Sequence, residues 1–277
     1  MRACVTAVPH SGGPPGAYVV DMPMITVRDT ATDPDGGLRP AYLAEPVAVT
    51  DRPGPWPGVV VMHDAIGMTD DIKEQADWLA AAGYVALVPD LYNGRSMVRC
   101  IKGTFSQLMA QQGPLFAQIE AARTHLAGLP SCTGTVGVIG YCMGGAFALL
   151  LAGRPGYAAA SVNYGLLPDN LEEVLAGSCP MVASFGAKDI ALKGAARKVE
   201  LALTRAAVPA DVKEYPNARH SFINRLTVAS PLSVLLKVTG VGYDHDSAAD
   251  AKERILSFFD AHLRAEQSVS AGSTGSG

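Results

Sequence analysis

The six residues 140–145, Gly-Tyr-Cys-Met-Gly-Gly, constrain the fold of this chain more than any other stretch. Residues 135–139, directly before them, are apolar and rich in β-branched side chains, which predicts a buried strand. Residues 146–152 are a run of alanine, phenylalanine and leucine, which predicts a buried helix. Cys142 therefore lies at a sharp corner between a strand and a helix.

The glycines on both sides of Cys142 have a steric reason. A nucleophile on such a corner has a strained backbone, and side chains beside it would collide with the strand and the helix that meet there. The pattern is typical of a nucleophile elbow, with cysteine in the serine position. The corner also puts the sulfur at a helix N-terminus, whose partial positive charge favours the thiolate.

Two other interpretations of this corner stay open. Cys142 can be a buried structural cysteine, because free cysteine behaves as a small apolar residue. That role does not explain the four glycines around the corner, which are Gly137, Gly140, Gly144 and Gly145. The corner can also hold a dinucleotide phosphate, but the spacing Gly-x-Gly-x-x-Gly is not met and the motif lies in the middle of the chain.

The remaining sequence alternates between predicted strands and helices. We expect strands at 24–28, 39–45, 58–62, 85–88, 135–139, 160–164, 181–185 and 211–215, and helices at 71–82, 115–126, 146–152, 171–175, 195–207 and 249–263. Residues 93–113 are expected to be irregular with helical patches. The first two strands favour an antiparallel hairpin, and the later alternation predicts an α/β fold, a mostly parallel twisted sheet with helices on both faces. We expect one domain, 17–265, between a loose N-terminus, 1–16, and a disordered tail, 266–277.

The amino-acid composition indicates which kinds of partner and which cellular compartment this protein is expected to have. Apolar residues make up 48% of the 277 and charged residues 17%, so a large core is expected. A net charge of −4 argues against nucleic acid as the main partner, and no apolar run is long enough to span a membrane. We read no signal peptide at the N-terminus. The five cysteines, Cys4, Cys100, Cys132, Cys142 and Cys179, form no Cys-x-x-Cys pair, which favours reduced thiols in a cytoplasmic protein and no zinc site.

A cysteine nucleophile needs a base, and the base needs an acid that orients it. In this fold the three follow in the order nucleophile, acid, histidine. His220 comes after the strand 211–215 and a short loop, which is where this fold places the catalytic base. The alternative interpretation is that His220 is a loop histidine hydrogen-bonded to the backbone. Asp189 directly follows the strand 181–185 and is our choice of acid, whereas Asp211 begins a strand and points to the other end of the sheet. The alternative interpretation of Asp189 is that its carboxylate lies in a loop and pairs with a neighbouring lysine.

The developing negative charge of a carbonyl reaction needs two N–H donors. We expect the backbone N–H groups of Met143 and Ala65 to supply them, since Ala65 lies in the turn after the strand 58–62. A metal site at His63 and Asp64 is a weak reading because neighbours in sequence point apart. Tyr92 and Tyr164 are further candidates for contact with a substrate.

Four motifs together resemble the dienelactone hydrolase family: Gly-Tyr-Cys-Met-Gly-Gly at 140–145, Pro-Asp-Leu-Tyr at 89–92, Gly-Ala-Lys-Asp at 186–189 and His-Ser-Phe at 220–222. Their order and spacing match over about 24–263. The resemblance implies an α/β-hydrolase fold, a Cys142–His220–Asp189 triad and no metal or other cofactor. Family members open the lactone ring of dienelactone to give maleylacetate.

The resemblance also implies roles for three charged residues, each with a departure from the family. Asp64 stands where the family commonly has a glutamate that holds the resting thiol, and aspartate is one methylene shorter. Arg95 and Arg225 lie nearest to the arginines that grip the substrate carboxylate, each offset by one residue. An apparent insertion at 227–243 is expected to reshape the mouth of the cleft.

Three functions follow as hypotheses. The first is an esterase or lactonase that forms a thioester on Cys142 and acts on a small molecule as a monomer or small homo-oligomer. The second is a small-molecule binding or redox-sensing protein that uses the same cleft without catalysis. The third is another carbonyl hydrolase, such as a thioesterase or a peptidase.

Overall fold

The structure is a computed structural model that describes residues 8–9, 18–19, 24–29, 37–47, 53–225 and 242–264. An eight-stranded sheet runs through the described part in the order β10-β9-β8-β7-β5-β6-β4-β3. A separate two-stranded sheet pairs β1, Val8–Pro9, with β2, Tyr18–Val19. β1 falls inside the segment 1–16 that we expected to be loose; the rest of that segment, the tail 266–277 and most of the insertion 227–243 lie outside the described residues.

The main sheet is parallel except at one edge. β3 (Met24–Asp29) and β4 (Gly37–Ala44) form the expected antiparallel hairpin, and β4 pairs antiparallel with β6 (Val85–Pro89). The other strands run parallel: β5 (Trp56–Met62), β7 (Cys132–Tyr141), β8 (Ala159–Asn163), β9 (Met181–Gly186) and β10 (Ala210–Tyr215). β5 and β6 are buried along their whole length because helices cover both faces.

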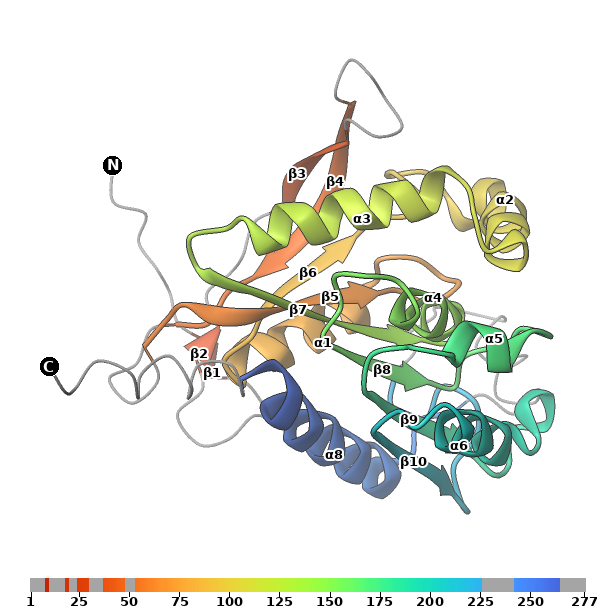
Figure 1. Ribbon diagram of the computed structural model, residues 1–277. Coiled ribbons are helices and arrows are strands. Elements are labelled where there is room, and N and C mark those ends of the chain that lie inside the picture. The colour runs from red at the N-terminus through yellow and green to blue at the C-terminus, as the bar shows by residue number, and fades with distance from the viewer. Residues whose placement is uncertain are drawn as a thin grey trace, which may run out of the picture.

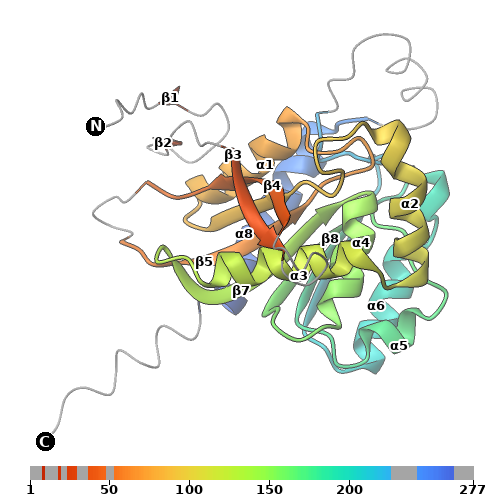
Figure 2. The same ribbon diagram turned by 90° about the horizontal axis from the view of Figure 1, so that it is seen from above.

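Helices lie on both sides of the sheet, as Figures 1 and 2 show. One face is covered by α1 (Asp70–Ala81) and α8 (His245–Leu263), and the other by α3 (Pro114–Ala127), α4 (Met143–Ala152) and α6 (Ala195–Arg205). The short helices α5 (Leu171–Leu175) and η1 (Ile190–Leu192) connect strands. The α/β prediction is therefore confirmed. None of the described helices is both long and apolar enough to cross a bilayer.

One element differs from the prediction. Residues 97–110, expected to be irregular, form a regular helix, α2 (Met97–Ala110). α2 buries only Thr104 and Leu108 and lies mostly on the surface. Its N-cap residue, Ser96, makes no capping hydrogen bond, and Gly103 interrupts the run of helix-forming residues, so the usual signals of a helix start and of a continuous helix are missing from this stretch.

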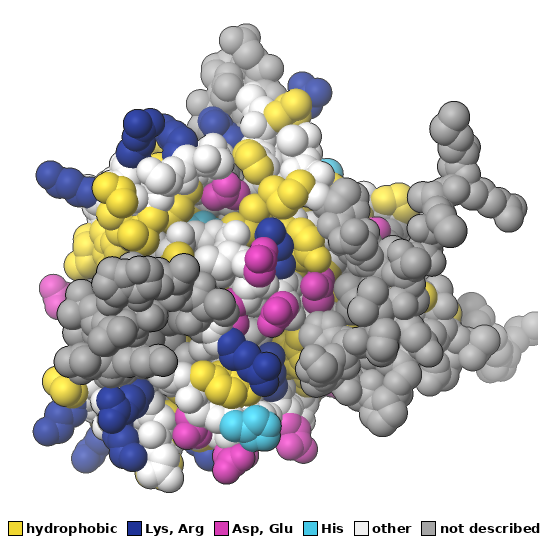
Figure 3. Space-filling model, turned by 180° about the vertical axis from the view of Figure 1, so that it is seen from behind, with side chains coloured by type: hydrophobic (Ala, Val, Ile, Leu, Met, Phe, Trp, Pro, Cys, Tyr) yellow, Lys and Arg dark blue, Asp and Glu magenta, His cyan; other side chains and the backbone are white. Residues whose placement is uncertain are grey.

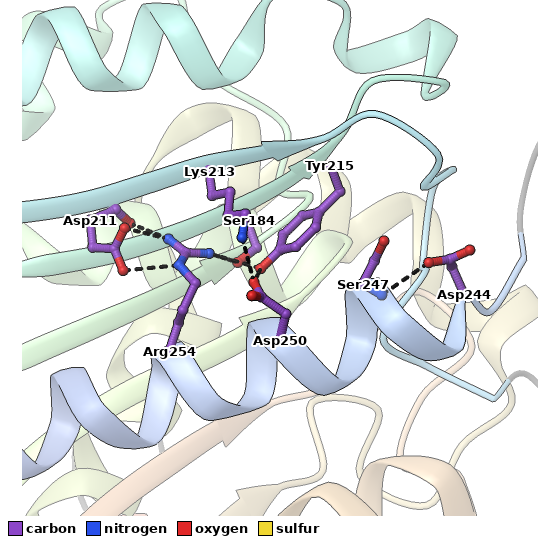
Figure 4. A network of polar contacts seen from close by, with 8 residues as sticks. All are labelled: Ser184, Asp211, Lys213, Tyr215, Asp244, Ser247, Asp250 and Arg254. Carbon is purple, nitrogen blue, oxygen red and sulfur yellow. Dashed lines mark hydrogen bonds and ion pairs between the residues drawn. The ribbon is translucent and has the colours of Figure 1, made fainter.

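A polar network fastens α8 to the edge of the sheet, as Figure 4 shows. The guanidinium group of Arg254 donates to both carboxylate oxygens of Asp211, at 2.6 and 3.0 Å, and to the hydroxyl of Tyr215 at 3.0 Å. Asp250 accepts hydrogen bonds from Lys213 at 2.8 Å and from Tyr215 at 2.7 Å. Asp211 thus serves the attachment of α8, in agreement with the prediction that it faces away from the histidine end of the sheet.

Candidate active site

The backbone at Cys142 has the strained geometry that the sequence predicted. Cys142 lies between β7 and α4 with φ 55° and ψ −114°, and its side chain is half-buried. A Cβ atom on Gly140 would lie 1.9 Å from the carbonyl oxygen of Gly144, and one on Gly144 would lie 2.1 Å from that of Met62. Only glycine fits at these two positions, so the strand and the helix can approach closely enough to expose the sulfur.

The three predicted triad residues meet at the carboxyl ends of three parallel strands. Asp189 follows β9, and its Oδ2 atom lies 2.6 Å from Nδ1 of His220, which follows β10. Oδ1 of Asp189 accepts a hydrogen bond from the backbone N–H of Ala191 at 3.1 Å, which fixes the carboxylate. Cys142 is the other side chain whose interaction with His220 raises the pKa of the imidazole. Asp189 is 3% exposed and the His220 side chain 21%, so the acid is enclosed and the base can be reached from solvent.

The charge state of His220 follows from its neighbours. Burial lowers the pKa of the imidazole, but hydrogen bonds to Asp189 and Cys142 and the charges of both partners outweigh burial and raise this pKa from 6.5 to about 10. At neutral pH this raised pKa favours the protonated, positively charged imidazole.

The histidine loop is held in place by Tyr164 and by two residues that the sequence analysis did not name, Asn224 and Asp71. The ring of Tyr164 lies edge-on to His220, with 5.4 Å between centroids, and its hydroxyl donates to Oδ1 of Asn224. Asn224 in turn donates to the buried carboxylate of Asp71, on α1, which also accepts from the backbone N–H of Arg225 at 2.7 Å. Tyr164 is fully buried, so we assign it to the support of His220 and not to direct contact with a substrate. No motif in the sequence marked Asn224 or Asp71 for this role.

The two residues expected to supply the oxyanion donors lie at the start of α4 and in the turn after β5. Met143 is the first residue of α4, so its N–H has no acceptor within the helix. Ala65 lies in the turn after β5, and its carbonyl oxygen accepts a hydrogen bond from the hydroxyl of Tyr92 at 2.7 Å. Tyr92 is only 2% exposed. Its hydroxyl thus orients the Ala65 peptide, a different role from the substrate contact that we expected.

His63 is structural. It is fully buried, and burial lowers the pKa of its ring. Its Nε2 atom accepts a hydrogen bond from the backbone N–H of Leu91 at 3.1 Å, which leaves Nδ1 to donate to the carbonyl oxygen of Asp64 at 2.7 Å. Both ring nitrogens are therefore used within the fold. Among the residues that the structure describes, no group of three or more histidines, cysteines or acids is arranged to hold a metal.

Asp64 lies close to the triad but has a backbone partner of its own. Its Oδ1 atom accepts a hydrogen bond from the N–H of Ile66 at 2.8 Å. Burial raises the pKa of this carboxyl group to about 6, with a smaller contribution in the same direction from Asp71, and the positive charge of His220 opposes the rise. Asp64 therefore changes charge in the neutral range within the field of His220, and its predicted contact with the resting thiol stays a prediction.

The two arginines predicted to bind the substrate carboxylate, Arg95 and Arg225, lie in separate parts of the structure. The guanidinium group of Arg225 lies over the ring of Tyr243, 4.9 Å from its centroid, beside the segment that precedes α8. Arg95 is exposed, donates through Nε to the carbonyl oxygen of Tyr92 at 3.3 Å, and lines a cavity between α2 and α3 that no triad residue lines. Their role in substrate recognition stays a prediction.

Comparisons with known proteins identify the family of this chain. The family model described as "Dienelactone hydrolase family" matches residues 40–263. A carboxymethylenebutenolidase from Pseudomonas sp. (strain P51) is 31% identical over 202 residues, covering 68% of this chain and 80% of the relative, and one from Pseudomonas putida is 28% identical, covering 74% and 85%. A crystal structure of a dienelactone hydrolase-like promiscuous phosphotriesterase from metagenomic libraries is 25% identical, with a TM-score of 0.70 over 87% of this chain and 98% of that one. The chain belongs to the dienelactone hydrolase family and has its α/β-hydrolase fold.

Proposed function

We propose that this chain is a hydrolase that cleaves a lactone or small ester through a Cys142–His220–Asp189 triad and a thioester intermediate. The observation that carries the proposal is the 2.6 Å contact between Asp189 and His220, together with a cysteine on a strained corner whose interaction raises the pKa of His220. The relatives named carboxymethylenebutenolidase support the choice of ester and lactone bonds.

The first half of the reaction forms the thioester. The Cys142 thiolate attacks the carbonyl carbon, and the carbonyl electron pair moves to oxygen, where the N–H groups of Met143 and Ala65 stabilise it. The intermediate collapses with cleavage of the C–O bond. The leaving alkoxide takes the proton that His220 carries on the nitrogen facing the sulfur. For a lactone this alcohol stays attached to the acyl group.

The second half restores the enzyme. His220, now neutral, removes a proton from water, and the hydroxide adds to the thioester carbonyl, again with the oxyanion held by Met143 and Ala65. Collapse breaks the C–S bond, releases the carboxylic acid and returns Cys142 as thiolate beside protonated His220. Asp189 keeps the imidazole in the orientation that both halves need.

We further infer a cytoplasmic protein that acts on small molecules as a monomer or small homo-oligomer, without nucleic acid or membrane as partner. The described cysteines Cys100, Cys132, Cys142 and Cys179 are all free thiols, as expected in a reducing compartment.

A substrate screen tests the proposal. Lactones and short acyl esters, each with and without a carboxylate, are compared on the parent chain, Cys142→Ala, Arg95→Ala and Arg225→Ala. We expect turnover of lactones or activated esters that Cys142→Ala abolishes, and a carboxylate preference that is lost in the arginine variant responsible. Full turnover by Cys142→Ala would refute the mechanism. Tight ligand binding without hydrolysis, with a thiol that does not react with iodoacetamide at neutral pH, would favour the binding or sensing protein.

A further inference from the structure

A cavity of about 190 Å³ lies between the C-terminal end of α2, one face of α4 and the loop that follows β8. Its walls are mostly aliphatic and include Leu108 and Met109 on α2, Ala146 and Leu150 on α4, and Leu166 and Leu167 in the loop. None of the described residues that line it is a lysine or an arginine. Sites that hold a whole drug-sized ligand measure about 300–1,000 Å³, so this cavity suits one apolar group of a larger molecule.

The cavity continues the candidate active site along α4. Ala146 and Leu150 follow Cys142 at intervals of four residues, and side chains at this spacing lie on one face of a helix. The N–H of Ala146 donates to the carbonyl oxygen of Cys142 at 3.1 Å, so the cavity begins one helical turn from the nucleophile. At a rise of about 1.5 Å per residue, Leu150 lies about 12 Å from Cys142 along the helix axis. A short aliphatic chain on a carbonyl held at Cys142 is long enough to enter the cavity.

The loop after β8 connects the same cavity to the base. Tyr164, whose ring lies edge-on to His220, begins this loop, and Leu166 follows two residues later. The loop also touches α4, because a Cβ atom on Gly145 would lie only 3.0 Å from the Cα atom of Gly165. Two walls of the cavity are thus built on the segments that carry the nucleophile and support the histidine.

The far end of the cavity is closed by hydrogen bonds. Nε2 of Gln111, the C-cap residue of α2, donates to Oδ1 of Asn170 at 2.5 Å. The guanidinium group of Arg154 donates to the carbonyl oxygen of Gln111 at 2.8 Å. These contacts join the end of α2 to α4 and to the loop, so the cavity is formed before any ligand enters it.

Apolar side chains stay exposed at the rim of the cavity. Met109 is 65% exposed and Leu166 is 40% exposed. Figure 3 shows hydrophobic side chains gathered at the left of the molecule, on the side where α2 lies. Removal of apolar surface from water is favourable, so an aliphatic group that fills the cavity and covers this rim would be stabilised there.

From these observations we infer that the cavity between α2, α4 and the loop after β8 binds the aliphatic acyl chain of the substrate, with Met109 and Leu166 as specificity-determining residues. The inference rests on the proposed function, because the chain must be carried by a carbonyl that Cys142 attacks. The acyl chain is the occupant and not the alcohol, since the alcohol leaves toward His220 and none of the described residues lining the cavity belongs to the His220 loop. A carboxylate on the substrate would lie elsewhere, because a charge buried without a partner is costly.

A series of p-nitrophenyl esters with acetyl, butyryl and hexanoyl groups tests the inference. Each buried methylene is worth about fourfold in binding, so we expect kcat/KM of the parent to rise at least about tenfold from acetate to hexanoate. Leu166→Ser and Met109→Gln should reduce this rise to about threefold or less. Leu201→Ser is the matched control, because Leu201 is 45% exposed, lies on α6 and does not line the cavity. Thermal unfolding confirms that each variant is folded.

A binding measurement separates this inference from the proposed function. Calorimetry compares hexanamide with acetamide on Cys142→Ala, which has no nucleophile. We expect hexanamide to bind at least about tenfold more tightly, and Leu166→Ser added to Cys142→Ala to remove the difference. Binding that behaves in this way, in a chain whose parent shows no turnover dependent on Cys142, would support the cavity and refute the hydrolysis.

Three results would overturn the inference. The first is turnover that depends on Cys142 with equal kcat/KM for acetate and hexanoate, which would leave the hydrolase without this acyl site. The second is an equal loss of chain-length preference in Leu201→Ser. The third is a preference that follows the alcohol, seen as a larger gain from methyl acetate to hexyl acetate than along the acyl series.

Discussion

Replacing Asp189 with asparagine tests how the triad sets the charge of its histidine. Asparagine has nearly the same shape, and its amide oxygen can still accept from Nδ1 of His220, at the position where Oδ2 of Asp189 lies 2.6 Å away. The substitution therefore removes the negative charge and leaves the packing almost unchanged. Because Asp189 is only 3% exposed, water does not replace the lost charge.

The size of the effect follows from the pKa of His220. Burial lowers that pKa, and Asp189 and Cys142 together raise it from 6.5 to about 10. At about 1.4 kcal/mol per pKa unit, the net rise corresponds to about 5 kcal/mol. The hydrogen bond to Asp189 is the largest of the effects that raise this pKa, so Asp189→Asn is expected to lower the His220 pKa toward 6.5.

The same shift predicts how stability depends on pH. The folded-state pKa of His220 lies above its unfolded value, so protonation of His220 stabilises the fold fully below pH 6.5, and this contribution is lost as pH rises through about 10. Between these limits the parent should lose more stability than Asp189→Asn, by up to about 5 kcal/mol, the size of the full shift. Lys252, whose pKa burial lowers to about 8, acts in the opposite direction but equally in both proteins.

The assay is a pH titration of the histidine ring signals by NMR, with kcat for an activated ester measured in parallel. We expect the His220 pKa to fall and kcat to drop by up to about 10⁴-fold, the loss seen when the triad aspartate of a serine protease is replaced by asparagine. Asp169→Asn is the control, because Asp169 is an exposed loop aspartate between Cys142 and His220 in the sequence. An unchanged His220 pKa in Asp189→Asn, or an equal loss of kcat in Asp169→Asn, would refute the reasoning.

Three further predictions concern the groups around the triad. Gly144→Ala should abolish folded, soluble protein, since its Cβ would lie 2.1 Å from a backbone oxygen of β5, whereas Gly103→Ala, with nothing within 4 Å, should stabilise α2 by about 0.5–1 kcal/mol in chemical denaturation. Burial raises the pKa of Asp64 to about 6, so the protonated carboxyl group stabilises the fold at low pH and this stabilisation is lost as pH rises through 6. Between about pH 4 and 7 the free energy of unfolding of the parent should therefore fall by about 3 kcal/mol relative to that of Asp64→Asn. An equal dependence of the two unfolding free energies on pH would contradict this. Tyr92→Phe should lower kcat about tenfold and the free energy of unfolding by about 1 kcal/mol, because the hydrogen bond to the Ala65 carbonyl is lost. An unchanged kcat would contradict the proposal that the Ala65 N–H stabilises the oxyanion.

The nucleophile corner and the acid–base pair were predictable because each is local in the sequence. The spacing of the glycines around Cys142 indicates a tight turn between a strand and a helix. Asp189 and His220 each follow a stretch that is recognisable as a strand. Parallel strands bring their carboxyl ends to one edge of the sheet, so the order of elements was enough to place the three together.

The supporting residues were not predictable because their roles depend on packing between distant segments. Asp71 lies in the first turn of α1, where an acid complements the helix dipole, yet it also holds the histidine loop through Asn224, 153 positions away in the sequence. Tyr164 and Tyr92 were expected to contact a substrate, but the fold buries both. α2 was expected to be irregular because its first residues lack a capping hydrogen bond and Gly103 interrupts it.

The most direct test of the central claim is mass spectrometry of the intact protein and its peptides after rapid acid quench of the reaction with p-nitrophenyl acetate. We predict a single added acetyl group, located on Cys142 and absent in Cys142→Ala, which accumulates further when His220→Ala slows hydrolysis of the thioester. An acetyl group on another residue, or turnover without any acylated protein and undiminished in Cys142→Ala, would contradict the account.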